Sequence, residues 1–200
     1  QRKDRLEVPG VGMVDATLIN AGNPTIFIHA YSLGLAGTEL QRDVNGQADL
    51  LARAEAIRAA GAVAMGLARS ADEATLKRPH TPKLAYVAAP APYTTSDGRP
   101  VAAGDVDLLV RIFSMGPLHH AMTGTGAVAI AVASAIPGTL VHEVAPADAD
   151  GHVCFGHPSG TLNVGAEAYT DDAGTWAIRQ VSMSRSARLL MDGQVFIPAA

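Results

Sequence analysis

Residues 119–127 combine two histidines, two threonines and two glycines directly before an apolar run that predicts a helix. The first amide N–H groups of a helix have no partner inside it, and the helix dipole adds partial positive charge there. Glycine has no Cβ, so a ligand can approach those amides closely. We therefore expect Gly124 and Gly126 to lie at a turn that binds a carboxylate or a phosphate. An ordinary tight turn between a strand and a helix is the alternative. Further donors could come from Thr123, Thr125, His119 and His120.

Patterns typical of nucleotide and metal sites are missing from the sequence. No Gly-Lys-Ser/Thr follows the glycines, and their spacing is not that of a dinucleotide-binding turn. His119 and His120 are adjacent, and neighbouring side chains on a strand point to opposite sides, so we do not expect them to chelate one ion. The histidines at positions 29, 80, 142, 152 and 157 are scattered, without a nearby cysteine pair. We therefore expect neither a nucleotide site nor a metal site from these residues.

Other reactive side chains favour structural roles. Cys154 is the single cysteine and lies in a short apolar strand predicted at 153–155, which favours a buried, inert thiol over a nucleophile. Ser159 lacks the Gly-x-Ser-x-Gly pattern of a hydrolase nucleophile. Arginine can hold a carboxylate with two parallel hydrogen bonds, but for Arg185 and Arg188 we favour pairing within the fold. For Arg111, just before the glycine turn, both roles stay open.

Composition excludes several functional classes. The chain has 200 residues, of which 48% are hydrophobic and 17% charged, so it is not disordered and can bury a core of its own. Fifteen basic and nineteen acidic residues give a net charge of -4, without the basic cluster that nucleic-acid binding needs. The apolar stretch 127–136 is too short for a bilayer, and no secretory signal follows the first charges, so we expect a cytoplasmic protein. The start without Met suggests a fragment.

Hydrophobic patterning predicts an α+β fold in which antiparallel strands surround one buried helix. The buried helix is 127–135, which is apolar nearly all round. A second helix is predicted over 47–60, with Gly61 as its stop, and a short one over 37–45. Two strands around a turn at 20–24 fill residues 11–29. Further strands are predicted at 81–88, 105–113, 139–144, 161–168, 175–183 and 187–197, and loops or turns at 90–100 and 151–160.

Several short motifs occur along the chain in a fixed order. They are Leu6-Glu7-Val8-Pro9-Gly10, Asn20-Ala21-Gly22-Asn23-Pro24-Thr25, His80-Thr81-Pro82-Lys83, residues 104–111, Ser114-Met115-Gly116 with His119-His120-Ala121-Met122, residues 156–162 and residues 183–188. With these motifs the chain resembles the 2-methylaconitate cis-trans isomerase (PrpF) family over nearly its whole length.

The resemblance implies a diaminopimelate epimerase-like fold, in which a curved antiparallel sheet wraps around a central helix. Such proteins have two similar domains with the active site between them, and residues 1–200 resemble the C-terminal domain alone. The implied chemistry is proton transfer on a small unsaturated tricarboxylate, without metal or cofactor. The lysine and cysteine that move the proton belong to the N-terminal half, so no catalytic residue is expected here. Thr123 stands where epimerase relatives have a cysteine.

The resemblance also implies the substrate-binding positions and the partners. The chain alone is expected to be inactive and to work with its N-terminal half. A 4-oxalomesaconate tautomerase and a methylitaconate delta-isomerase are the alternative activities. A non-catalytic binding or interaction domain is the alternative of another class, and an exposed cleft surface could give a homodimer. The substrate-binding positions are Asn23, Ser114, Met115, His119, Thr123, Gly124, Thr125 and Gly126.

Overall fold

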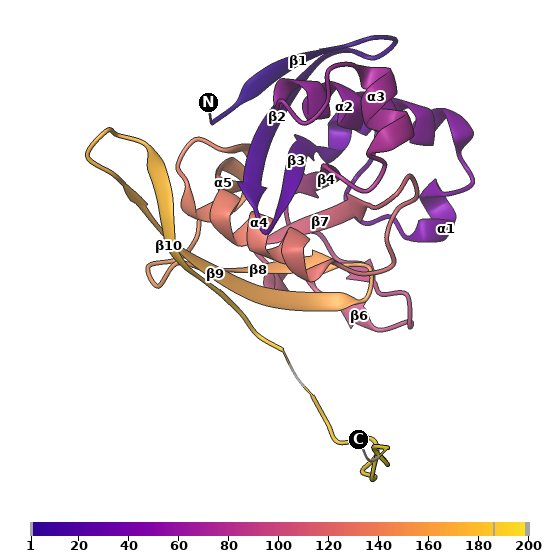
Figure 1. The fold of residues 1–200 in the computed structure, drawn as a ribbon, viewed down its shortest axis with the longest axis vertical. Helices are drawn as coiled ribbons and strands as arrows, with labels where there is room; N and C mark the ends of the chain where they lie inside the picture. The colour runs from indigo at the N-terminus through magenta and orange to yellow at the C-terminus, as the bar shows by residue number, and fades with distance from the viewer. Residues whose placement is uncertain (1, 186, 199–200) are drawn as a thin grey trace.

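The structure, a computed structural model, describes residues 2–185 and 187–198. Within these residues, a curved sheet of order β1-β2-β3-β4-β7-β8-β9-β10 wraps around helix α4 (Gly124–Ala135) (Figure 1). The strands are β1 (Asp4–Val8), β2 (Gly12–Ala21), β3 (Asn23–His29), β4 (Lys83–Ala88), β7 (Leu108–Phe113), β8 (His152–His157), β9 (Gly160–Thr170) and β10 (Trp176–Met183). A separate small pair consists of β5 (Tyr93–Thr94) and β6 (Pro100–Val101), inside and at the end of the predicted 90–100 loop.

The sheet is mixed, although antiparallel pairing was expected throughout. Strands β3 and β4 run parallel, as do β7 and β8, while the other neighbours are antiparallel. Parallel neighbours need a long crossover, usually a helical one. The first crossover contains α1 (Gln41–Val44), α2 (Ala48–Ala64) and α3 (Ala71–Lys77), and the second contains α4 and α5 (Leu140–Val144).

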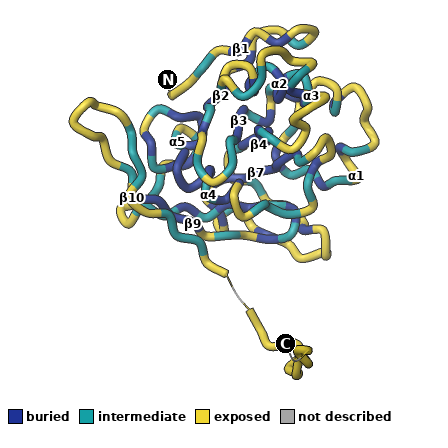
Figure 2. The backbone as a smooth tube through the Cα atoms, in the orientation of Figure 1, coloured by how far each residue is buried: buried dark blue, intermediate teal, exposed yellow. Residues whose placement is uncertain are grey.

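Alternation along the central strands gives the sheet two apolar faces. The buried side chains of α4 and the residues that pack around them form one cluster, which we call the α4 cluster. On β3, Phe27 belongs to this cluster, whereas Ile26 and Ile28 pack on the opposite face in a second cluster that includes α2. The α4 cluster also takes Phe155 from β8 and Val164 from β9, so the helix is enclosed by both ends of the sheet. Figure 2 shows this helix among the most buried parts of the molecule. The predicted buried helix is confirmed.

Two segments have the opposite structure from the one predicted. Residues 140–144 form helix α5 instead of a strand, because the Thr139 side chain caps the helix by accepting from the His142 amide at 3.0 Å. Its valines had favoured a strand. The predicted turn at 151–160 instead holds β8, whose Val153 and Phe155 alternate into the core.

Helix α2 does not stop at Gly61, as the sequence had suggested, but continues to Ala64. A Cβ at Gly61 would lie 2.2 Å from Cδ1 of Ile26 on β3. The glycine therefore permits close packing of the helix on the sheet and does not end it. The predicted helix over 37–45 is also shorter, since α1 covers only Gln41–Val44. Helix α3 was missed, although Ser70 caps it by accepting from the Glu73 amide.

The C-terminal segment 187–198 was predicted to contain a strand but has no regular structure. It extends away from the body of the molecule (Figure 1). A strand needs a neighbour to take its backbone hydrogen bonds, and none of the described residues supplies one here. Its large apolar residues, among them Leu189, Met191 and Phe196, are exposed, and the backbone of this segment is coloured as exposed in Figure 2.

Candidate functional site

The first turn of α4 has two backbone amides without a helical partner. Thr123 is the N-cap, and its Oγ1 accepts a hydrogen bond from the Gly126 amide at 3.1 Å. The Ala127 amide donates to the Thr123 carbonyl at 2.9 Å, which closes the first helical turn. The amides of Gly124 and Thr125 have no acceptor within a helix of this geometry, and both residues are exposed. This end of the helix can therefore receive an anion.

The two glycines of this turn serve different purposes. A Cβ at Gly124 would meet only Cε of Met183, at 3.8 Å, so the space outside this residue is open. Gly126 is buried, and a Cβ there would lie 2.7 Å from Oγ1 of Thr123 and 2.8 Å from Cδ1 of Ile112. Gly126 is thus required by packing and by the cap, and only Gly124 of the pair presents an accessible amide.

The turn between β2 and β3 packs against the start of α4. Gly22 in this turn has φ +70°, and a Cβ there would lie 3.0 Å from the Thr125 carbonyl oxygen. Asn23 follows directly, and its Oδ1 accepts a hydrogen bond from Oγ1 of Thr81 at 3.2 Å. The structure thereby brings Asn23 close to the first turn of α4.

Ser114 lies just beyond the end of β7. Ile112, two residues earlier, packs against Gly126, and Ser114 continues on the same face of the sheet. Its Oγ accepts a hydrogen bond from the Lys83 ammonium at 2.7 Å. Met115 comes next with φ 56°, a left-handed conformation that is uncommon for a residue with a side chain. Met115 borders a pocket that Phe113 and other residues line on the α2 side of the sheet, so it does not join Ser114.

Lys83 was quoted in a sequence motif but not recognised as a site residue. Only 8% of it is exposed, and burial, followed by the charge of Arg58, lowers the pKa of its amine. The available signal was a lysine within the predicted strand 81–88, next to the apolar residues 84–88.

The histidine pair is arranged differently from the prediction. The rings of His119 and His120 stack with centroids 4.4 Å apart, because this segment is not a strand and its side chains do not alternate. His119 Nδ1 accepts from the Ala121 amide at 3.1 Å. On β8, burial and then the charges of Arg111 and His119 lower the pKa of His157 to about 4. Within residues 2–185 and 187–198, no group of three His, Cys, Asp or Glu side chains could hold a metal ion.

The structure decides the role left open for Arg111 and shows the surroundings of Arg185, Arg188 and Cys154. Arg111 is fully buried and donates to the carbonyls of Glu39, Val110 and Gly156, so its role is structural. Arg185 and Arg188 lie exposed near the C-terminal end, and neither takes part in an ion pair among the residues that the structure describes. Burial, together with the charge of Asp107, raises the pKa of Cys154, which fits an unreactive thiol.

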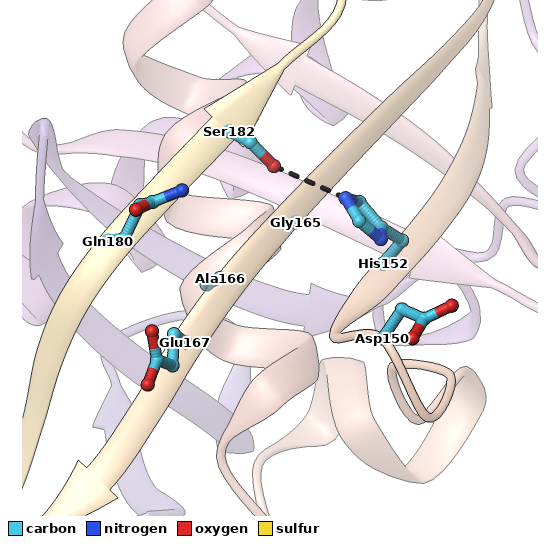
Figure 3. Close-up of a pocket in the computed structure, with 7 residues that line it drawn as sticks. All are labelled: Asp150, His152, Gly165, Ala166, Glu167, Gln180 and Ser182. Carbon is cyan, nitrogen blue, oxygen red and sulfur yellow. Dashed lines mark hydrogen bonds between the residues drawn. The ribbon is translucent and has the colours of Figure 1, made fainter.

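A pocket elsewhere on the sheet contains none of the predicted residues (Figure 3). It lies across β8, β9 and β10, where His152 Nε2 and Ser182 Oγ are 3.4 Å apart. Glu167, at its edge, pairs with Arg179. In the part of the chain that the structure describes, no helix is long and apolar enough to cross a membrane.

The sequence matches a family model described as PrpF protein over residues 1–198. It is 58% identical over 195 residues to a 2-methyl-aconitate isomerase of Shewanella oneidensis, covering 98% of this chain and 49% of the relative. It is 56% identical to a 2-methyl-aconitate isomerase of Cupriavidus necator, with the same coverage. The chain thus spans about half the length of these relatives.

The fold is likewise found in a solved structure. A crystal structure of methylitaconate-delta-isomerase superposes with a TM-score of 0.80 at 34% identity, over 92% of this chain and 48% of that one. The fold is therefore diaminopimelate epimerase-like, as expected, with the parallel strand pairs described above.

Proposed function

The chain belongs to the PrpF protein family, and on this premise we propose that it forms the C-terminal, substrate-binding half of an isomerase for small unsaturated tricarboxylates. The proposal is supported mainly by the first turn of α4, where Gly124 and Thr125 are exposed and their amides have no partner within the helix. Asn23 and Ser114 lie beside this turn and add polar groups.

Such a turn suits a substrate whose carboxylate gains charge during the reaction. When a base removes a proton from the carbon next to the double bond, the electron pair spreads into the conjugated carboxylate. The former double bond then has single-bond character and can rotate, and the proton returns to the same carbon to give the other geometric isomer. Amides already aimed at the carboxylate stabilise that charge without reorganising. This half therefore binds and polarises the substrate.

The proton-accepting group comes, in this proposal, from the N-terminal half of the same protein. Thr123 occupies the cap, and a threonine hydroxyl is too weakly acidic to exchange the proton unaided. The reaction needs no metal or cofactor in this scheme, because the carboxylate itself takes up the electron pair. We accordingly assign no catalytic base to this chain and expect it to be inactive alone.

Among related activities, the identities favour 2-methylaconitate as the substrate. The two 2-methyl-aconitate isomerases are 58% and 56% identical to this chain, against 34% for the methylitaconate-delta-isomerase. 2-Methylaconitate carries three carboxylates and methylitaconate two, so a measurement with both compounds decides between them.

Deuterium uptake tests this function. The complete protein, with both halves, is incubated with 2-methylaconitate in deuterated water and followed by proton NMR. We expect the label to enter the carbon next to the double bond as the isomers interconvert, and we expect no uptake with residues 1–200 alone. If the complete protein leaves the substrate unlabelled and unchanged, the proposed function is wrong.

A further inference from the structure

Lys83 is a buried lysine without an acidic partner. Only 8% of Lys83 is exposed, and its side chain donates a hydrogen bond to Oγ of Ser114 at 2.7 Å. None of the ion pairs among the described residues includes Lys83. Removing an ammonium from water without a counter-ion is unfavourable, so a purely structural role does not account for it.

Strand register places this ammonium on the α4 face. Ala85 and Val87 of β4 belong to the α4 cluster, and alternation puts Lys83 on the same side. Lys83 pairs with Thr25 on β3, and because Leu84 pairs with Phe113 on β7, the next position along that strand is Ser114.

The same end of the sheet adjoins the open turn of α4. Ile112, which precedes Ser114 by two residues, packs against Gly126, and Gly22, which precedes Thr25 by three, packs against the Thr125 carbonyl. The ammonium, the Ser114 hydroxyl and the exposed amides of the first helical turn therefore share one corner of the molecule.

We propose that Lys83 is a substrate-binding residue whose ammonium, together with Ser114, receives a second carboxylate of the tricarboxylate bound at the α4 turn. This inference rests on the function proposed above and adds a residue and a contact to it. The carboxylate supplies the counter-ion that the fold lacks. Since Ser114 Oγ accepts from Lys83, its own proton is free to be donated to the same carboxylate.

A ligand-truncation experiment tests the contact in the complete protein. Calorimetry compares propane-1,2,3-tricarboxylate with glutarate and methylsuccinate, each of which lacks one of its carboxylates. For Lys83→Met we expect affinity for the tricarboxylate to fall about 10- to 100-fold, the value of one charged hydrogen-bonded contact. One of the two dicarboxylates should then bind the variant and the unaltered protein equally, because it lacks the carboxylate that Lys83 contacts. Lys77→Met, an exposed lysine on α3, serves as the matched control and should change nothing.

Thermal unfolding separates this role from a structural one. Lys83→Met removes a buried, unpaired charge, so we expect its melting temperature to equal or exceed that of the unaltered protein. A large drop in melting temperature, or an equal loss of affinity for all three ligands, would assign Lys83 to the fold and overturn the inference. Unchanged tricarboxylate affinity in a well-folded variant would do the same and leave the proposed function intact. If the unaltered protein neither binds the tricarboxylate nor exchanges deuterium, the proposed function fails and this inference with it.

Discussion

At the scale of single residues, the glycine turn contains one position that we propose for substrate binding and one that packing requires. A Cβ added at Gly124 would have open space around it, whereas one at Gly126 would collide with Thr123 and Ile112. The sequence alone assigned both glycines to ligand binding, because it showed only their spacing. The two glycines differ because Gly126 is turned towards the sheet and Gly124 is not. This orientation is known only once the helix is packed on the sheet.

We predict opposite effects for valine at these two positions. Gly124→Val should weaken tricarboxylate binding by about tenfold or more, since a branched side chain blocks one charge-assisted amide contact, and it should change stability by less than about 0.5 kcal/mol. Gly126→Val should lower the free energy of unfolding by about 1–3 kcal/mol through overpacking. Urea unfolding and calorimetry measure both quantities. A destabilised Gly124→Val variant with normal affinity would reverse the assignment.

His157 makes stability depend on pH in a defined window. Its pKa is about 4 in the folded protein against an ordinary value of 6.5, so the unfolded chain binds more protons between these values. The neutral imidazole thus contributes fully above about pH 6.5, and the contribution is lost as pH falls towards 4. From the size of the shift, the loss is up to about 3 kcal/mol.

His157→Asn should therefore flatten the decline of stability between pH 6.5 and 4, as measured by urea unfolding at several pH values. His80→Asn removes an exposed imidazole and is the matched control. The same slope in both variants and the unaltered protein would show that His157 does not carry this dependence.

At the scale of elements, the sequence predicts the parts whose patterning is strong. The apolar run of α4, the alternation of β7 and the turn between β2 and β3 are all in place. The helix over residues 140–144 was predicted as a strand because valine favours strands. The Thr139 cap and the packing of this segment stabilise the helix instead. Parallel pairing was missed because periodicity within one strand says nothing about the direction of its neighbour.

The candidate site was predictable only in part for a related reason. The glycine turn is local, so the sequence shows it, and family motifs supply Asn23 and Ser114. Lys83 lies 31 residues from Ser114 along the chain, and only the register of β4 on β7 brings the two together. Met115 follows Ser114 directly but faces the other side of the sheet.

At the scale of the whole molecule, we propose that the groups described here form one wall of a substrate site. The open turn of α4, Ser114 and Lys83 can hold carboxylates, and the proton-transferring group has to approach from outside this wall. The match over about half the length of the relatives is consistent with that division. Binding to α4 is therefore the central claim, and it can be tested separately from turnover.

Amide chemical shifts measured during a titration of the complete protein with propane-1,2,3-tricarboxylate test this claim most directly. We predict that the amide signals of Gly124 and Thr125 move most, and that the Gly126 amide, bonded to Thr123, moves less. Shifts concentrated instead around His152 and Ser182, in the pocket of Figure 3, with the α4 signals unmoved, would contradict the account.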